Sequence, residues 1–277
     1  MKTANWATFP HDSSAFEYPG NALVKAWPAL HRGDQEPFPD EARVQDLDPG
    51  CSDAGSVSME LQQAWRDFHA GRFAAAVDRA EKLGLLAHAV ANKASGIYAD
   101  YLEDNDDRKL EIYQAGIQRA ERAIAAYPED ANAHYFHAFL LGRYSQCISV
   151  AKALAEGVGG KIRQSLETAL KLSPDHAEAH TALGLYHAEI IDKVGKLIGG
   201  MTYGANADKG MAQCQQALAL TPEAPIAHIE YGNALYLLYG DKRADDSNAA
   251  YEQAAALEPI EAMQKLDIEY ARASMAE

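Results

Sequence analysis

Cysteine is scarce in this sequence, and its spacing excludes the common uses of the residue. Three cysteines, Cys51, Cys147 and Cys214, occur in 277 residues, and no two of them form a Cys-x-x-Cys pair. An odd number of widely separated cysteines fits neither a disulfide framework nor a zinc site. Cys147 and Cys214 lie in helical patterns, where a free thiol usually packs as a small hydrophobic side chain. Such usage suits a reducing compartment.

Long apolar runs and basic runs are also missing. No run of about 18 apolar residues occurs, so we expect no membrane span. The opening residues, MKTANWATFPHDSSAF, lack the apolar centre of a secretory signal, and with Met1 in place we expect a cytoplasmic protein. The formal net charge is −15, and no basic run exceeds two residues. A surface of this charge repels nucleic acid and anionic lipid, and it favours solubility or a basic partner.

Two glycine-rich segments lack the features of a phosphate-binding loop, which needs G-x-x-x-x-G-K-[ST] between a strand and a helix. The segment EGVGGKI follows Ala155, which stands where the first glycine is required, and Ile162 replaces the hydroxyl residue. The segment GGMTYGANADKG, residues 199–210, lacks the Gly-Lys-Ser/Thr ending. We interpret it as a helix end capped at Gly199-Gly200, a turn, and a new helix beginning near Asn206.

The histidines do not form a metal-binding pattern. His134, His180 and His228 each follow a proline by six residues. Equivalent positions in neighbouring repeats lie about 10 Å apart, whereas metal–ligand bonds measure about 2 Å, so we expect these rings to pack between helices. A local cluster of His134, His137 and His187 is the remaining candidate for a metal or proton site. Because G-x-S-x-G and H-E-x-x-H are also absent, we predict no catalytic residues, no metal and no cofactor.

Proline divides the chain into two parts. Six of the 11 prolines lie in the first 50 residues, and four of these follow an aromatic residue. Proline disfavours helix at its own position and at the one before it. We therefore predict an arm over residues 1–55 that is mostly extended, with at most one short helix near 21–27. Its aromatic side chains gain from burial, so we expect the arm to lie on its own domain or on a partner.

Residues 56–277 form the second part, which is rich in alanine and has apolar residues at helical spacing. Three segments repeat: YPEDANAHYFHA from Tyr127, SPDHAEAHTALG from Ser173 and TPEAPIAHIEYG from Thr221. In each, an alanine lies five residues before the proline and a histidine six residues after it. Such a proline ends one helix, and the following helix packs against it. Because one helix hairpin cannot bury its apolar face alone, successive hairpins stack.

These segments resemble the tetratricopeptide repeat (TPR). AHTALGLYH and AHIEYGNAL are similar to its first helix, and AAYEQAAALEP is similar to its second, with Tyr251, Ala254 and Pro259 at the expected places. HAGRFAAAVDRAEKLG is similar to the turn and second helix of an opening repeat. The resemblance implies an all-α, TPR-like solenoid of about five antiparallel helix pairs and a C-terminal capping helix near 260–275. The expected pairs span 57–84, 86–127, 131–173, 177–221 and 224–258.

Two adjacent repeats are longer than the family's unit of about 34 residues. Pro128 to Pro174 is 46 residues and Pro174 to Pro222 is 48, and the surplus lies between the paired helices. Stretched repeats of this kind resemble a subgroup that includes regulators of microtubule dynamics and periplasmic accessory components of TRAP-type transporters. The missing export signal departs from the transporter component. That resemblance leaves an alternative function, a small-molecule-binding accessory subunit of a transport system.

The first helix of each TPR pair lines the concave face, so the resemblance also predicts contact residues. This groove is mostly apolar and aromatic, and the arm and the lengthened edge add further contacts. The main hypothesis is a non-catalytic scaffold or accessory subunit that binds another protein, or a second copy of itself. The alternative is that helix packing covers these side chains. The predicted partner-binding residues are Tyr135, Phe139, Arg143, Leu185, Ile229, Asn233 and Tyr236 in the groove, Met201 and Tyr203 at the edge, and Trp6, Phe9 and Trp27 in the arm.

Overall fold

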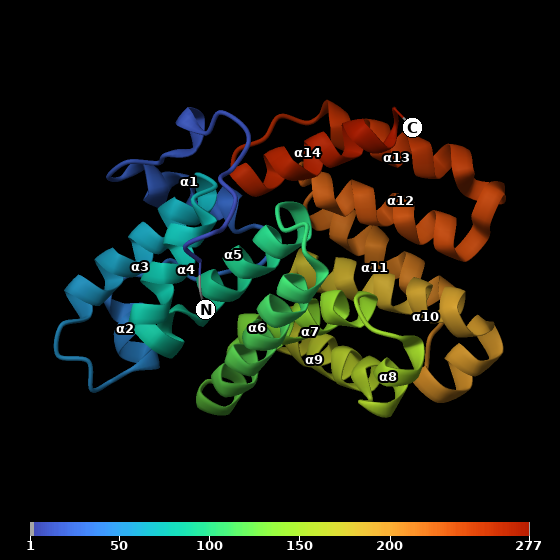
Figure 1. Ribbon diagram of the computed structural model, residues 1–277, viewed down its shortest axis with the longest axis horizontal. Coiled ribbons are helices and arrows are strands. Elements are labelled where there is room, and N and C mark those ends of the chain that lie inside the picture. The colour runs from blue at the N-terminus through green and yellow to red at the C-terminus, as the bar shows by residue number, and fades with distance from the viewer. Residues whose placement is uncertain (1–2, 277) are drawn as a thin grey trace. The chain divides into compact units, whose positions relative to one another are not determined.

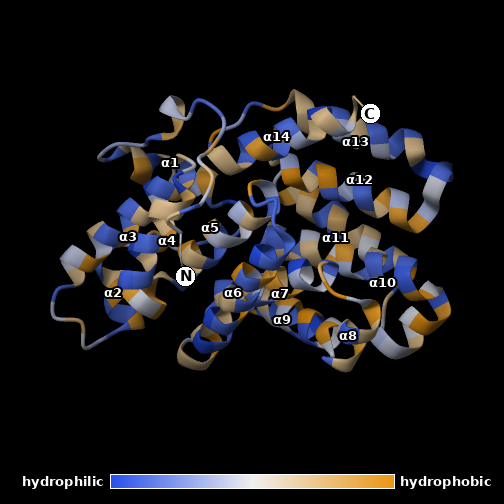
Figure 2. Ribbon diagram, in the orientation of Figure 1, coloured by the Kyte–Doolittle hydropathy of each residue, from blue (hydrophilic) through white to orange (hydrophobic). Residues whose placement is uncertain are grey.

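The computed structural model of the protein describes residues 3–276 (Figure 1). Fourteen α-helices and three short 3-10 helices, with no β-strand, make up the regular structure of these residues. Blue and orange alternate along the helical ribbons in Figure 2, because each helix has both hydrophilic and hydrophobic residues. The all-α prediction is therefore confirmed.

The helices after residue 53 follow the predicted order of paired helices and a final single one. In chain order the packed pairs are α3/α4, α5/α6, α10/α11 and α12/α13; between the second and third of these, α7 packs on α6 and α9 packs on α10, with the short α8 between them in sequence, and α14 comes last. Their bounds are α3 Ala54–His69, α4 Phe73–Leu83, η2 Gly84–Ala87, α5 His88–Tyr101, α6 Asp106–Ala126, α7 Ala131–Gln146, α8 Val150–Ala155, α9 Val158–Leu172, α10 Ala177–Tyr203, α11 Ala207–Leu220, α12 Pro225–Tyr239, η3 Gly240–Arg243, α13 Ala244–Ala256 and α14 Ala262–Ser274.

The recurring histidines close the turns between pairs. The Nε2 atom of His134 lies 2.9 Å from the carbonyl oxygen of Pro128, and His180 makes the same contact with Pro174. His228 repeats it on Pro222 at 2.7 Å. Since a carbonyl can only accept, each Nε2 carries the proton and donates it. The histidines thus satisfy a carbonyl that the proline leaves outside the helix.

Small residues allow the two helices of a pair to approach closely. A Cβ atom added to Gly184 in α10 would lie 2.3 Å from the Cys214 sulfur and 3.0 Å from the carbonyl oxygen of Gly210, both in α11. At Gly232 in α12, it would lie 3.0 Å from the carbonyl oxygen of Ser247 in α13. Larger side chains at these crossings would force the helices apart.

The contacts divide the chain into two compact units. Unit 1 comprises residues 3–31, 36–152 and 260–263, and unit 2 comprises residues 32–35, 153–259 and 264–276. Helix α7 therefore belongs to unit 1 and α9 to unit 2. The boundary of the arm at residue 55 is based on the change from proline-rich to alanine-rich sequence, and it stays a prediction.

The N-terminal arm folds onto unit 1 of its own chain. It contains η1 (Ser14–Phe16), α1 (Ala22–Leu30) and α2 (Glu41–Leu47). The Trp27 ring in α1 lies edge-on against Trp65 of α3, with 5.7 Å between ring centroids, and its indole nitrogen donates to the Glu36 carbonyl at 2.8 Å.

The expectation of at most one short helix in the arm is wrong. Helix α1 continues through Pro28, because Leu23, Trp27 and Leu30 share one face and are all buried. Helix α2 begins at an N-cap residue: the Asp40 side chain accepts a hydrogen bond from the Arg43 backbone nitrogen at 2.9 Å. Burial and capping outweigh the preference of proline for extended chain.

In unit 2, α10 ends later than predicted. The helix breaks at Gly195, where φ is 79°, then continues to Tyr203, and the left-handed residue that ends it is Gly204, with φ of 63°. Gly199 stays helical and buried. The predicted cap at Gly199-Gly200 is therefore wrong, whereas the start of the next helix at Asn206 is correct, since that side chain accepts from the Lys209 backbone nitrogen at 2.9 Å.

The docked arm should contribute substantially to stability. Replacing Trp27 by alanine removes a side chain that is 5% exposed, so we expect a loss of about 3–5 kcal/mol in the free energy of unfolding. Val24 in the same helix is 49% exposed, and Val24→Ala should change stability by less than about 0.5 kcal/mol. Chemical denaturation followed by circular dichroism measures both variants. Equal stability of W27A and the parent protein would contradict the docked position of the arm.

Candidate partner-binding surfaces

On α7 in unit 1, the predicted groove residues form a row that is largely engaged within the protein. Tyr135 is 6% exposed, and its ring centroid lies 6.2 Å from that of Phe139. The Arg143 guanidinium lies 5.7 Å from the Phe139 centroid and pairs with Asp100 of α5, with 2.8 Å between Nε and Oδ2. Asp100 also accepts from the Tyr113 hydroxyl at 2.5 Å, and its burial raises its pKa. The row is therefore held by contacts between α5, α6 and α7.

The arm aromatics named as contact residues also pack on unit 1. Trp6 stacks flat on Tyr98 of α5, with 3.9 Å between ring centroids. Phe9 lies directly over Gly71, where a Cβ would come within 2.5 Å of its ring and where φ is 78°. Trp27 is buried against α3 as described above. All three aromatic side chains therefore pack on unit 1 of the same chain. Their binding of a partner stays a prediction.

A buried polar cluster lies beside the Trp27 contact in unit 1. The Nδ1 atom of His69 lies 2.6 Å from a carboxylate oxygen of Glu261, and the two side chains are 0% and 1% exposed. The His31 ring of the arm lies 5.2 Å from the His69 ring, centroid to centroid. Burial lowers the pKa of His69, and the charges of His31 and Lys93 lower it further, while Glu261 acts in the opposite direction. His69 is thus neutral and donates its Nδ1 proton to Glu261.

In unit 2, the predicted groove residues divide into buried and accessible ones. Ile229 is 2% exposed and packs in one cluster with Ala271 of α14. The Asn233 amide donates to Glu230 at 2.7 Å and accepts from the Tyr251 hydroxyl at 2.6 Å, so both of its ends are used internally.

The accessible residues of unit 2 form what we call the α10–α12 strip: Leu185, Tyr236 and Leu237. Leu185 and Leu237 are partly buried and pack against the same apolar cluster between α10, α11 and α12. Tyr236 is 56% exposed. Leu185 and Tyr236 are among the predicted groove residues, and Leu237 is the neighbour of Tyr236 in α12. The strip is the part of the predicted groove that remains open to a partner.

The end of α10 carries a second accessible surface. Met201 is 81% exposed, and Leu197 and Ile198, which were not among the predicted contact residues, are 76% and 56% exposed. Tyr203 is half-buried, with its ring against Gly159. The sequence KLIGGM, residues 196–201, has apolar residues at helical spacing, which could have identified Leu197 and Ile198 as part of one face with Met201. The predicted helix end at Gly199-Gly200 separated them from Met201.

The described residues offer no metal site of three or more His, Cys, Asp or Glu side chains. The Nδ1 atom of His187 accepts a hydrogen bond from the Asn206 backbone nitrogen at 3.4 Å, next to the start of α11. Burial lowers the pKa of His187. No helix among residues 3–276 has the length and apolar composition to cross a bilayer.

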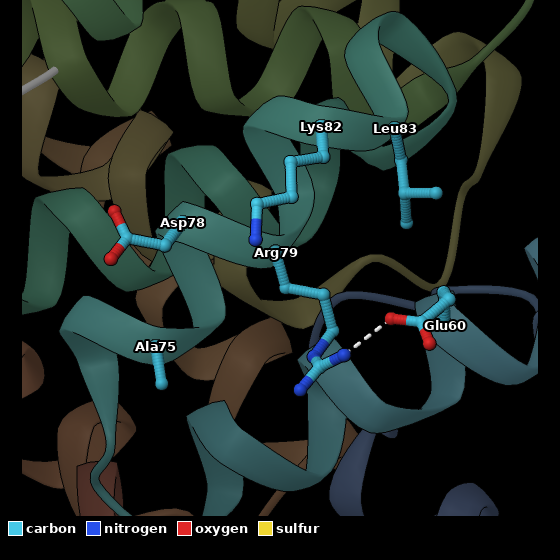
Figure 3. A pocket seen from close by; sticks show the side chains of 6 residues that line it. All are labelled: Glu60, Ala75, Asp78, Arg79, Lys82 and Leu83. Carbon is cyan, nitrogen blue, oxygen red and sulfur yellow. Dashed lines mark hydrogen bonds and ion pairs between the residues drawn. The ribbon is translucent and has the colours of Figure 1, made fainter.

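A pocket of about 410 Å³ lies between α3 and α4, and Figure 3 shows the side chains around it. Arg79 pairs with Glu60 across the pocket and with Asp67 at 3.3 Å. Asp78 accepts a hydrogen bond from Thr3 of the arm. These charged groups therefore join helices and arm, and they form no nucleophile–base pair.

Comparisons with known proteins agree with this architecture. Residues 76–193 match the family model described as regulator of microtubule dynamics protein 1-3. Among solved structures, the chain is similar to a thermophilic TPR protein of Thermus thermophilus, with a TM-score of 0.56 and 18% identity, over 78% of this chain and 99% of that one. A search of the curated proteins gives no match. The fold is TPR-like, and the predicted resemblance to the microtubule-dynamics regulators is confirmed.

The buried His69 makes stability depend on pH. Its lowered pKa keeps the native state neutral at pH values where the unfolded chain takes up a proton, so unfolding is favoured as pH falls below about 6.5. We expect the free energy of unfolding to fall by up to about 1.4 kcal/mol for each pH unit of acidification. His69→Gln should flatten this dependence, and Met59→Gln at an exposed position of α3 should leave it unchanged. Urea denaturation across this pH range measures the slopes, and identical slopes would refute the assignment.

Proposed function

We propose that this protein is a non-catalytic scaffold or assembly subunit that binds another protein through the α10–α12 strip. The observation that carries the proposal is the exposure of Tyr236 on α12, the helix whose Leu237 packs with Leu185 against one apolar cluster, in a TPR-like fold. Repeats of this kind bind partners along the first helices of their pairs. A large exposed aromatic residue next to a partly buried apolar surface has the composition of an interface hot spot.

The other predicted groove positions support the choice of this strip. Tyr135 and Ile229 are buried, Arg143 is paired with Asp100, and the Asn233 amide is bonded at both ends. Recruiting them would require breaking internal contacts, whereas Leu185, Tyr236 and Leu237 can be covered without rearrangement.

The partner segment should be apolar where it meets the strip and basic around it. The chain has 40 acidic and 25 basic residues, a balance that speeds encounter with positively charged partners. Absence of enzymatic activity belongs to the same proposal, because TPR-like repeats typically act by binding.

Affinity capture with the full chain tests the proposal. The intact protein should retain a stoichiometric partner from its native lysate, and Tyr236→Ala should weaken binding of the purified partner about 30-fold, as for a hot-spot residue. Met59 in α3 is 63% exposed, and Met59→Ala serves as the control that keeps full affinity. Equal affinities for the parent protein and Y236A, with both folded by circular dichroism, would rule out the strip as the binding site.

A further inference from the structure

Residues 3–10, which we call the N-terminal segment, lie on the outside of unit 1. Thr3, Trp6 and Phe9 contact α4, α5 and the turn between α3 and α4, whereas the four residues between them are exposed. Every third residue of the segment therefore faces unit 1. The Trp6 and Phe9 side chains are only half-buried, so the segment covers a surface that the helices have already formed.

Tyr98 of α5 contacts the segment through both its ring and its hydroxyl. The ring stacks on that of Trp6, with 3.9 Å between centroids and 3° between planes. The hydroxyl accepts a hydrogen bond from the Ala7 backbone nitrogen at 3.1 Å. One side chain thus holds an aromatic residue and the backbone of an extended chain, which is how aromatic-lined sites recognise peptides.

Two further contacts flank this stack. On one side, the Asp78 carboxylate of α4 accepts a hydrogen bond from the Thr3 hydroxyl. On the other, Phe9 occupies the space above Gly71, where any Cβ would come within 2.5 Å of its ring. Hydroxyl, first ring and second ring of the segment each have a separate place on unit 1. We call this set of places the Tyr98 surface, and it comprises Gly71, Asp78 and Tyr98.

The N-terminal segment is held by few contacts. Among the described residues, one backbone hydrogen bond joins it to the helices, from Ala7 to Tyr98. The Trp6 nitrogen bonds within the segment, to the Thr3 carbonyl at 2.9 Å. Terminal segments attached in this way open at a small fraction of the free energy that unfolds the domain. Opening uncovers Tyr98, which is 2% exposed beneath the segment, and makes its ring available to another chain.

The Tyr98 surface adjoins a cavity. The pocket of about 410 Å³ between α3 and α4 has Asp78 in its wall, together with side chains of these two helices alone (Figure 3). No described residue of the arm lines it. A longer chain bound at Asp78 has this additional surface beside it, so it can make contacts that the described N-terminal segment lacks.

Reach and charge decide which chain replaces the segment. Residues 10–13 join Phe9 to η1, and Phe16 of η1 is buried in unit 1. Four extended residues span about 14 Å, so a second copy can exchange its segment only if the two chains approach within that distance. Each copy has a net charge of −15, which opposes so close an approach. The occupant favoured by these constraints is a different protein.

We propose that the Tyr98 surface is a peptide-binding site, which the N-terminal segment occupies in cis until an extended segment of a partner protein displaces it. The contacts define the ligand. One aromatic side chain stacks on Tyr98, a second lies three residues later over Gly71, and a hydroxyl residue three positions before the first bonds to Asp78. This site goes beyond the proposed function, since it uses no residue of the α10–α12 strip.

Fluorescence anisotropy with a labelled synthetic peptide of residues 3–12, TANWATFPHD, tests the proposal. The full-length Trp6→Ala/Phe9→Ala variant should bind this peptide at least tenfold more tightly than the parent protein, whose tethered segment competes at a millimolar effective concentration. The milder Trp6→Ala variant should have an intermediate affinity. A peptide with alanine in place of both aromatic residues should not bind.

Changes at the site and in the segment make the test specific. Asp78→Ala, at an exposed position of α4, should weaken peptide binding by W6A/F9A about fivefold, because one hydrogen bond is lost. Asn5→Ala with Thr8→Ala is the matched control, since both side chains are exposed in the same segment. This control should exclude the peptide as the parent protein does.

The partner chemistry is tested by selecting a random peptide library on W6A/F9A, which should enrich aromatic residues three positions apart. Peptide affinity that is equal for W6A/F9A and the parent protein, or selection without this spacing, would overturn the proposal. Dimerisation of the parent protein that disappears in W6A/F9A would assign the site to a second copy instead. Tyr236→Ala in the W6A/F9A background should leave peptide binding unchanged, so this proposal and the proposed function can fail separately.

Discussion

The close approach of paired helices is the constraint on which the rest of this structure depends. Where α10 crosses α11, Gly184 faces Gly210 and Cys214 with no room for a side chain. That proximity brings apolar side chains of α10, α11 and α12 into one cluster. Since a single hairpin leaves half of such a cluster in water, each pair depends on its neighbours for stability.

Local signals in the sequence predicted most of the helix pairs, because proline and capping residues act over only a few positions. The proline turns after 128, 174 and 222 and the start of α11 at Asn206 depend on hydrogen bonds within one turn of helix. The arm could not be predicted in this way. Helix α1 forms around Pro28 because Trp65, far along the chain, offers a surface to Trp27. Propensity carries no information about such a contact.

The candidate surfaces were predicted only partly, for a similar reason. Repeat offsets identify which positions face the groove, but burial there is decided by other segments: Ile229 packs with α14, and Arg143 finds Asp100 on a neighbouring helix. Tyr236 stayed open, as its offset indicated. Leu197 and Ile198 were missed because a glycine pair looked like a helix end, whereas the left-handed conformation falls at Gly204. Two accessible surfaces in unit 2, one at Tyr236 and one at Leu197, Ile198 and Met201, therefore emerged from the three-dimensional arrangement.

The contact between His69 and Glu261 has a consequence for the order in which the protein is made. Unit 1 includes residues 260–263, which are synthesised long after the rest of that unit, residues 3–31 and 36–152. At about 5–20 residues per second, roughly 10–40 s pass between synthesis of His69 and of its carboxylate partner. Until Glu261 has been synthesised, the His69 imidazole lacks its acceptor, so the final packing of unit 1 waits for a segment that is made long after the rest of that unit.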